Sequence, residues 1–505
     1  MDGGKVFLVG AGPGDPELLT LKGLRCLQQA HLVLHDTLAN TALLKHVRPD
    51  CEIIDVGKKP GTQNRQQDET NTLMVDGARA GKTIVRLKGG DPFLFGRGGE
   101  EAEHLRKAGI VYEVVPGVTS PVSVPAYAGI PVTHRDFSPY VTIVTGHRAS
   151  LDGTPEVDWG ALGRLDGTLV ILMGVRNRAE IARRLMDGGR PPETPVAVIQ
   201  RGTLPTQRTL RTRLDELGDI SAESPAVIVV GKVAGLELGW FEDRPLFGKR
   251  ILVTRARDQS DRLAASLEAL GAEVLEAPTI RFDPPEDWSP VDRAIAEADS
   301  FGWVVFSSVN AVDRFFERVL GTGEDISIFQ NTKFAAVGPA TRDRVESYHI
   351  LVNLCPAVHT AEGFAVEFKE EVMDGQRVLI PRPEVAREHL ANALIRSGAT
   401  VEEVVVYRTV VPDDIPGTVK RALAEGELDL LTFTSSSTVR NLITLMPPLT
   451  DQKWLETPAA CIGPSTSKTA GENGMNVAVS APEDDVTIQG LVTSIRNYFL
   501  SRSSF

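Results

Sequence analysis

The chain has 505 residues, a hydrophobic fraction of 42% and a formal net charge of −13. This length predicts two to four domains, and the apolar content suits large buried cores and argues against a disordered chain. The acidic balance disfavours binding to nucleic acid, which needs clustered Lys and Arg, and the apolar runs are shorter than the ~20 residues of a membrane helix. We therefore expect a soluble protein with neither a nucleic-acid nor a membrane partner.

Neither the N-terminus nor the cysteines indicate a secreted or metal-binding protein. Met1 to Lys5 run straight into a predicted strand, without the basic and apolar segments of a signal peptide. We expect a cytoplasmic protein with no metal cofactor, because the cysteines form no Cys-x-x-Cys pair and lie far apart. They are expected to be buried as small apolar side chains: Cys26, Cys51, Cys355 and Cys461.

Strand-like runs alternate with amphipathic helical patterns through the first half, which predicts an α/β architecture. The expected helices include Leu18–Gln29 and Glu100–Lys107. The expected strands are Lys5–Gly10, Leu32–Leu34, Thr83–Leu87, Val141–Val144, Leu169–Leu172, Val196–Ile199 and Ala226–Val230.

Three glycine-containing loops follow strands in this half. Val9–Pro16 begins like a dinucleotide-binding fingerprint, but two prolines interrupt the match, so a plain tight turn is an equal interpretation. Arg86–Phe93 has two adjacent glycines, which allow a ligand to approach the backbone closely. Val115–Ser120 is the third loop. Because loops after the strands of one sheet gather at its carboxyl edge, we expect a single cleft there.

Together, Gly10–Asp15, Arg86–Glu101 and Pro116–Arg135 resemble the signatures of uroporphyrinogen-III C-methyltransferases, within the tetrapyrrole methylase superfamily. The resemblance implies two α/β subdomains with a cleft, a homodimer, and two methyl transfers from S-adenosylmethionine to uroporphyrinogen III, giving precorrin-2. The sulfonium makes the methyl group electrophilic and the pyrrole carbons are electron-rich. Alignment of the two can therefore supply much of the catalysis, up to ~7–11 kcal/mol in favourable systems.

The same resemblance implies roles for single residues. Asp36 matches the family's proposed proton acceptor and Lys58 its proton donor; a turn-capping carboxylate and a partner for a substrate carboxylate are the alternative interpretations. Met173 would be a core methionine by periodicity alone. The residues implied in S-adenosylmethionine binding are Pro13, Gly89, Gly90, Asp91, Leu94, Thr119, Ser120, Met173 and Gly202.

The implied substrate carries many carboxylates, and Arg can pair with a carboxylate through two parallel hydrogen bonds. We therefore expect some basic residues of the first half to line a substrate trough. The candidates are Arg86, Lys88, Arg97, Arg135 and Arg148.

The alternation breaks in the segment Glu237–Gly248, and a new strand begins at Arg250. We place the boundary there, which gives domains 1–244 and 245–505. The second half repeats itself: Arg250–Arg255 matches Arg377–Arg382, and the Phe-Ser-Ser run at 306–308 matches the Phe-Thr-Ser run at 433–435, both at an offset of 127 residues. A repeat this long predicts two similar α/β lobes facing each other across a ligand-binding cleft.

Ser- and Thr-rich loops follow predicted strands of both lobes, where they could bind anions or cap helices. The pieces Phe306–Val312, Val404–Thr409, Leu431–Ser436 and Ile462–Thr466 resemble uroporphyrinogen-III synthase, over residues from about Gly248 to Tyr498. The family fold has two lobes joined by crossing segments. It implies one lobe of about 248–281 plus 408–505 and another of about 282–407.

The implied reaction closes linear hydroxymethylbilane to uroporphyrinogen III, with loss of water and inversion of ring D. Tyr407 matches the family tyrosine proposed to assist departure of the hydroxyl; a strand-end tyrosine packed against its lobe is the alternative. The candidate substrate contacts are Ser308, Ser435, Ser436 and Thr466.

The two implied activities are consecutive, because the product of the second half is the substrate of the first. Two other interpretations stay open: the first half could methylate a later precorrin, and the second could be a two-lobed binding or regulatory module. An NAD-dependent oxidoreductase is disfavoured by Pro13 and by the missing ribose-binding acid. The sequence does not predict whether the product leads to siroheme or cobalamin.

Overall fold

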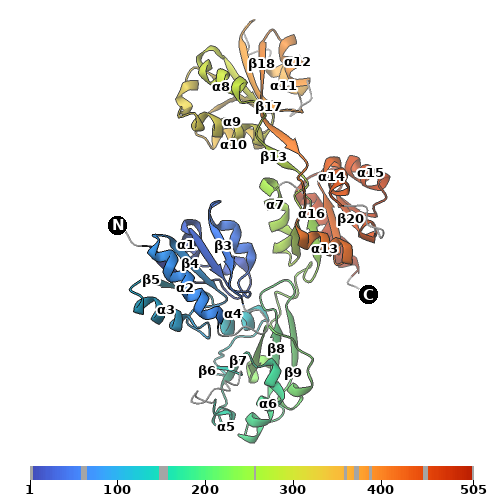
Figure 1. Ribbon diagram of the computed structural model, residues 1–505. Helices are drawn as coiled ribbons and strands as arrows, with labels where there is room; N and C mark the ends of the chain where they lie inside the picture. The colour runs from blue at the N-terminus through green and yellow to red at the C-terminus, as the bar shows by residue number, and fades with distance from the viewer. Residues whose placement is uncertain are drawn as a thin grey trace. The chain divides into compact units, whose positions relative to one another are not determined.

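The computed structural model describes residues 4–57, 65–146, 157–254, 257–357, 361–368, 375–385, 389–446 and 453–502. Within these ranges the strands form four sheets covered by helices (Figure 1), which confirms the α/β prediction. The chain divides into two compact units: Met1–Ile251 with Ala265–Val274 and Arg496–Phe505, and Leu252–Ala264 with Leu275–Ile495. The predicted domain and lobe limits stay predictions.

The first sheet is wholly parallel, in the order β3-β2-β4-β1-β5. Its buried strands are mostly apolar because helices cover both faces. Val9 and Val33 lie in one core with Leu27 of the first helix, and Leu8 and Met74 lie in the other. The strands are β1 (Lys5–Gly10), β2 (Leu32–His35), β3 (Glu52–Asp55), β4 (Thr83–Lys88) and β5 (Val111–Val115); the helices are α1 (Leu21–Gln29), α2 (Arg65–Arg79) and α3 (Gly98–Lys107), with 3-10 turns η1 (Pro16–Leu18) and η2 (Thr41–His46).

The first expected helix begins later than the sequence pattern suggests. Leu18 ends the 3-10 turn η1, and α1 starts at Leu21. Thr20 is the reason, because its hydroxyl accepts a hydrogen bond from the Gly23 N–H (3.1 Å) and caps the helix.

The second sheet is mixed, in the order β6-β7-β10-β8-β9, with only the β6–β7 pair parallel. Its core contains Leu169, Ile171 and Val198 with Ile181 and Leu185 of α6. The strands are β6 (Val141–Thr145), β7 (Thr168–Leu172), β8 (Pro195–Gln200), β9 (Arg208–Arg213) and β10 (Ala226–Val230); the helices are α4 (Ser120–Tyr127), α5 (Trp159–Gly163) and α6 (Arg178–Asp187), with 3-10 turns η3 (Val175–Asn177), η4 (Leu214–Asp219) and η5 (Lys232–Gly235).

The third sheet, in the order β12-β11-β19-β20-β21, joins strands from the two ends of the second half. Thr254 donates a hydrogen bond to the Thr432 carbonyl (2.7 Å), and Thr432 donates one to the Leu252 carbonyl (3.0 Å). The strands are β11 (Arg250–Val253), β12 (Glu273–Glu276), β19 (Leu430–Phe433), β20 (Ala459–Cys461) and β21 (Val477–Ser480); the helices are α7 (Arg257–Ala269), α13 (Gly417–Glu425), α14 (Ser436–Leu445), α15 (Pro464–Glu472) and α16 (Ile488–Arg502), with the 3-10 turn η8 (Lys453–Glu456).

The fourth sheet, in the order β13-β18-β17-β14-β15-β16, is formed by the residues between those two ends. The repeated Phe-Ser-Ser and Phe-Thr-Ser runs end equivalent strands, Phe306 closing β14 and Phe433 closing β19. The strands are β13 (Arg281–Asp283), β14 (Trp303–Phe306), β15 (Lys333–Ala336), β16 (Val352–Leu354), β17 (Arg377–Pro383) and β18 (Thr400–Val410); the helices are α8 (Ser289–Ala296), α9 (Val309–Gly321), α10 (Pro339–Glu346), α11 (Ala361–Phe368) and α12 (His389–Arg396), with 3-10 turns η6 (Ala298–Ser300) and η7 (Ile326–Phe329).

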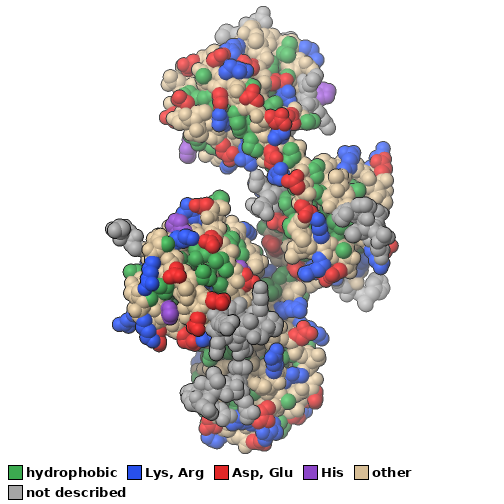
Figure 2. Space-filling view, in the orientation of Figure 1, with side chains coloured by type: hydrophobic (Ala, Val, Ile, Leu, Met, Phe, Trp, Pro, Cys, Tyr) green, Lys and Arg blue, Asp and Glu red, His purple; other side chains and the backbone are tan. Residues whose placement is uncertain are grey.

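The structure also shows the distribution of surface charge, the burial of the cysteines and the character of the helices in the described residues. Figure 2 shows Lys and Arg side chains interspersed with Asp and Glu over the face in view. Cys26 and Cys461 are buried as expected, whereas Cys51 and Cys355 are only half-buried, because each lies near the end of a sheet-edge segment. Among the described helices, none combines the length and apolar character needed to cross a membrane.

Candidate active sites

The three glycine-containing loops meet at the carboxyl edge of the first sheet. Gly12 and Gly90 exchange backbone hydrogen bonds, from Gly90 N to Gly12 O at 2.7 Å and from Gly12 N to Gly90 O at 3.3 Å. The third loop joins them through Gly117, whose N–H donates to the Asp91 carboxylate at 3.0 Å. The loops after β1, β4 and β5 therefore form one connected structure.

The glycines in these loops serve two different purposes. A Cβ on Gly117 would lie 2.2 Å from the Gly90 carbonyl oxygen, and one on Gly10 would lie 2.5 Å from the Gly117 Cα, so these two glycines allow the backbones to touch. Gly90 has φ +66°, and the nearest atom to a Cβ there would be 3.9 Å away. The space beside Gly90 is thus open to a ligand, whereas Gly89 packs against Leu38.

Strained backbone gathers in the loops that follow β4, β7 and β8 in the first half. Of the six non-glycine residues with positive φ in the described ranges, five lie here: Phe95, Arg97, Met173, Arg201 and Thr203. Such conformations are costly and cluster at ligand sites. Met173 is 49% exposed after β7, so the core-methionine interpretation is wrong. The apolar pattern of a strand predicts burial only within the strand, and Met173 follows the last residue of β7.

The remaining residues implied in cofactor binding lie on these same loops. Thr203 accepts a hydrogen bond from the Asp15 N–H (3.0 Å), which ties the loop containing Gly202 to the loop containing Pro13. Thr119 occupies the N-cap of α4 and Ser120 begins that helix. The Leu94 N–H donates to the Asp91 carbonyl at 3.4 Å.

Asp36 belongs to a chain of charged side chains that continues into the interior. It directly follows β2, and its carboxylate accepts a hydrogen bond from the Arg86 guanidinium. Arg86 Nε and Lys88 Nζ both donate to Oε1 of Glu101 on α3, at 3.1 and 2.9 Å. Burial, followed by the neighbouring charge of Arg86, lowers the pKa of Lys88 from its usual 10.5.

The predicted substrate-binding cations differ in exposure. Arg86 and Lys88 are buried, because β4 directs both toward Glu101. Arg97 is exposed and pairs with Glu100, and Arg135 is exposed. Two predicted residues, Lys58 and Arg148, lie outside the described residues.

In the second half, Tyr407 and Ser308 lie together. The Tyr407 hydroxyl is 3.5 Å from the Ser308 Oγ, and its ring packs edge-on against Phe282 at 5.3 Å between centroids. Tyr407 lies within the long strand β18 and is 6% exposed. Ser308 also caps α9, since its Oγ accepts from the Ala311 N–H at 3.2 Å.

The other candidate contacts lie at the starts of α14 and α15. Ser435 caps α14 by accepting a hydrogen bond from the Thr438 N–H at 3.3 Å. Ser436 donates to the Ser465 carbonyl at 3.1 Å and so joins the two helix starts. Thr466 is buried in the first turn of α15. Helix capping is therefore confirmed for Ser308 and Ser435.

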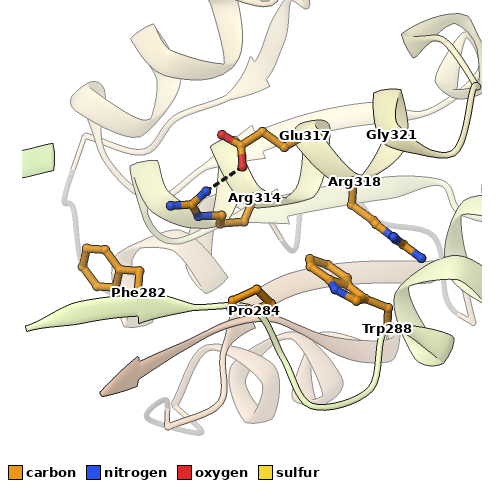
Figure 3. Close-up of a pocket in the computed structure, with 7 residues that line it drawn as sticks. All are labelled: Phe282, Pro284, Trp288, Arg314, Glu317, Arg318 and Gly321. Carbon is orange, nitrogen blue, oxygen red and sulfur yellow. Dashed lines mark hydrogen bonds and ion pairs between the residues drawn. The ribbon is translucent and has the colours of Figure 1, made fainter. Parts of the chain in front are cut away.

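A small cavity of about 220 Å³ adjoins the Tyr407 side of the fourth sheet (Figure 3). Phe282, which packs on Tyr407, lines it together with Trp288. Arg314 at its rim pairs with Glu317, and Arg318 pairs with Asp292 and stacks on Trp288. The cavity therefore offers aromatic walls beside cations that already have carboxylate partners.

Comparison with protein families gives a separate match for each half. The family described as tetrapyrrole (corrin/porphyrin) methylases matches residues 5–218. The family described as uroporphyrinogen-III synthase HemD matches residues 261–493.

Related proteins cover the chain to different extents. The porphyrin biosynthesis protein HemD of Ruminiclostridium josui is 36% identical, over 95% of this chain and 96% of that protein. The uroporphyrinogen-III C-methyltransferase of Bacillus subtilis is 42% identical, over 70% of this chain and 73% of its own length. A siroheme synthase of Zymomonas mobilis is 49% identical, over 48% of this chain and 52% of its own. Among solved structures, the uroporphyrin III C-methyl transferase of Thermus thermophilus covers 46% of this chain and 99% of its own, at 42% identity and a TM-score of 0.41.

Proposed function

The chain belongs to the fused proteins that join a tetrapyrrole methylase to a uroporphyrinogen-III synthase, and on this premise we propose that its halves catalyse consecutive reactions. It is an S-adenosylmethionine-dependent uroporphyrinogen-III C-methyltransferase and a uroporphyrinogen-III synthase of tetrapyrrole biosynthesis. The match to a relative over 95% of the chain carries this conclusion, because it includes both halves in the same order.

The C-terminal half acts first in the proposed order. It converts hydroxymethylbilane to uroporphyrinogen III with inversion of ring D. The N-terminal half then methylates uroporphyrinogen III twice and releases precorrin-2. The product of one half is thus the substrate of the other.

The converging loops suit S-adenosylmethionine, which supplies an electrophilic methyl group when bound. The open space beside Gly90, the exposed Met173 and the start of α4 at Thr119 and Ser120 all support this placement. The backbone here can contact the cofactor closely, because Gly90 has no side chain in the way. The full proposed set is Pro13, Gly89, Gly90, Asp91, Leu94, Thr119, Ser120, Met173 and Gly202.

Asp36 is the proposed acceptor of the proton that the methylated macrocycle loses, and Lys58 is the proposed donor. Asp36 is suited to this role because its side chain is 30% exposed while Arg86 fixes one carboxylate oxygen. Arg97 and Arg135 are exposed and are the proposed partners of substrate carboxylates. For Arg86, Lys88 and Arg148 this role stays a prediction.

Tyr407 is the proposed acid of the synthase half. It donates its proton as the C–O bond of the hydroxymethyl group breaks and water leaves, and Ser308 orients its hydroxyl. A positioned acid of this kind contributes ~10²–10⁴-fold to a rate. The proposed substrate contacts are Ser308, Ser435, Ser436 and Thr466.

A coupled assay tests the whole proposal. The full chain is supplied with hydroxymethylbilane and S-adenosylmethionine, and the expected product is precorrin-2. Formation of only the type I isomer would identify the second half as a binding or regulatory module. Uroporphyrinogen III that forms but stays unmethylated would point to a later precorrin as the methyl acceptor.

The assembly state is proposed from the methylase resemblance. We expect a cytoplasmic homodimer formed through the N-terminal half. Light scattering on the full chain should give twice the 54.6 kDa mass of one chain, and a monomer would contradict the proposal.

A further inference from the structure

Glu101 is a buried carboxylate to which the proposed mechanism gives no role. It lies on α3 with 0% exposure, and its Oε1 accepts hydrogen bonds from Arg86, Lys88 and Gln67, the last at 3.2 Å. Its second oxygen, Oε2, is buried with no hydrogen-bond partner among the described residues. A buried carboxylate is costly unless cations compensate it, so this position needs an explanation.

Two cations, Arg86 and Lys88, lie between the two carboxylates of Glu101 and Asp36. Arg86 bridges the two carboxylates, with Nε on Glu101 and Nη2 on Asp36. Lys88 Nζ binds Glu101 and lies 3.9 Å from Asp36 Oδ2, beyond hydrogen-bond distance. Arg86 is further fixed by the Leu34 carbonyl, at 3.2 Å. Glu101 is the buried end of this chain of charges and Asp36 its exposed end.

We propose that Glu101 is a positioning residue for methyl transfer, which holds Lys88 and Arg86 so that Asp36 presents a free carboxylate oxygen to the substrate. This inference rests on the proposed role of Asp36 as proton acceptor. Glu101 draws the ammonium of Lys88 away from Asp36 Oδ2. Without the charge of Glu101, Lys88 and Arg86 would both turn to Asp36 and occupy the two oxygens that accept a proton.

The other polar groups near Asp36 do not bind its carboxylate. His35 on β2 contacts the Asp36 backbone carbonyl through Nδ1, at 3.3 Å, and not the carboxylate. The Asp55 carboxylate on β3 accepts from the Gly57 N–H at 2.8 Å. In the described part of the chain, Arg86 and Lys88 are thus the cations paired with Asp36.

The first experiment replaces Glu101 by Gln in the full chain. Glu101→Gln keeps the shape of the side chain and removes its charge. We expect kcat for methylation of uroporphyrinogen III to fall about 10- to 100-fold, as for a misplaced catalytic group, with KM for S-adenosylmethionine within about twofold. Because Asp36 then faces two cations, the acidic limb of the pH–rate profile should move to lower pH. The matched control is Glu103→Gln, which removes an exposed carboxylate of the same helix.

A double variant separates positioning from folding. Lys88→Met with Glu101→Gln removes one cation and one anion, so Arg86 remains as the one cation beside the one carboxylate of Asp36. We expect the double variant to recover at least about tenfold in kcat over Glu101→Gln and to regain the wild-type acidic limb. A double variant no faster than Glu101→Gln would overturn the inference. Synthase activity of the same chains reports the amount of chain in each assay, and a KM for S-adenosylmethionine within about twofold of the wild-type value shows that the methylase half is folded.

Asp36→Asn tests the proposed role of Asp36 separately from the role of Glu101. If Asp36→Asn keeps the wild-type kcat, the proposed role of Asp36 fails and this inference fails with it. If Asp36→Asn loses methylation but Glu101→Gln keeps the wild-type kcat and pH profile, only the role of Glu101 is overturned.

Discussion

Single glycines fix how closely the loops of the proposed methyl-transfer site approach one another. Gly117→Ala would place a Cβ 2.2 Å from the Gly90 carbonyl, and because that neighbour is backbone the loops must separate. We expect a loss of about 1–3 kcal/mol in stability and at least tenfold weaker S-adenosylmethionine binding. Unfolding in urea and titration calorimetry measure the two effects. Gly99→Ala is the control, since its Cβ meets nothing within 4 Å; a similar loss there would contradict the steric explanation.

Glu113 makes part of the stability of the first sheet dependent on pH. Hydrogen bonds from Lys22 and then Lys5 lower the pKa of Glu113 from 4.5 to about 2. This stabilisation is therefore present above pH 4.5 and is lost as the pH falls toward 2. Because the groups are about one-third exposed or more, Glu113→Gln should cost only about 0.5–1 kcal/mol at pH 7. Urea unfolding from pH 7 to pH 3 should show the difference shrinking; a constant difference would contradict the linkage.

At the level of elements, α4 connects the first glycine loop to the segment Glu237–Gly248. The Tyr127 hydroxyl donates to the Asp15 carboxylate at 2.7 Å, and its ring packs against Trp240 and Phe241. Burial, then the hydrogen bond and charge of Asp15, raise the pKa of Tyr127 above its usual 10. The hydroxyl therefore stays protonated and donates throughout the neutral range.

Tyr127→Phe keeps this ring packing and removes the hydrogen bond to Asp15. We expect a loss of about 1.5–3 kcal/mol in stability, the range for a hydrogen bond to a charged acceptor, and weaker S-adenosylmethionine binding because Asp15 lies in the proposed cofactor loop. Unfolding experiments at pH 6 and pH 9 should give the same loss. A loss that disappears at pH 9 would mean that the phenol ionises there.

In the repeated strand–helix units of the second half, Ser308 and Ser435 cap the N-termini of the equivalent helices α9 and α14. Ser308→Ala and Ser435→Ala each remove an N-cap, so each should cost about 0.5–2 kcal/mol in stability. Ser308→Ala should also slow uroporphyrinogen III formation, because Ser308 contacts the Tyr407 hydroxyl. A synthase assay at matched folded fraction separates the two effects. A wild-type rate for Ser308→Ala would remove Ser308 from the proposed site.

For the whole molecule, the main consequence of fusion is that the two activities can be separated by mutation. The two proposed catalytic residues lie in different sheets: Asp36 follows β2 of the first sheet, and Tyr407 lies in β18 of the fourth. Asp36→Asn should therefore lose methylation and keep synthase activity, and Tyr407→Phe should do the reverse. An equimolar mixture of the two variants should convert hydroxymethylbilane to precorrin-2. No conversion by the mixture would indicate that the intermediate passes within one chain.

Most of the fold is predictable from local patterns. Lys5–Gly10 and Ala226–Val230 coincide with observed strands because buried strands read as continuous apolar runs. The start of α1 was less predictable, since the hydroxyl of Thr20 caps the helix after a short 3-10 turn. Local patterns do not predict which strands pair. For example, β11 lies beside β19, which comes about 180 residues later in the chain.

The sequence by itself determined the α/β class, the strand–loop order and the motifs by which each half resembles its family. Only the tertiary structure decided which side chains share a site. Arg86 and Lys88 read as free cations, yet both are buried against Glu101, because alternate residues of β4 face α3. Met173 reads as a core residue, yet its left-handed backbone turns it outward. Burial and pairing depend on elements distant in the chain, so no single segment of the sequence encodes them.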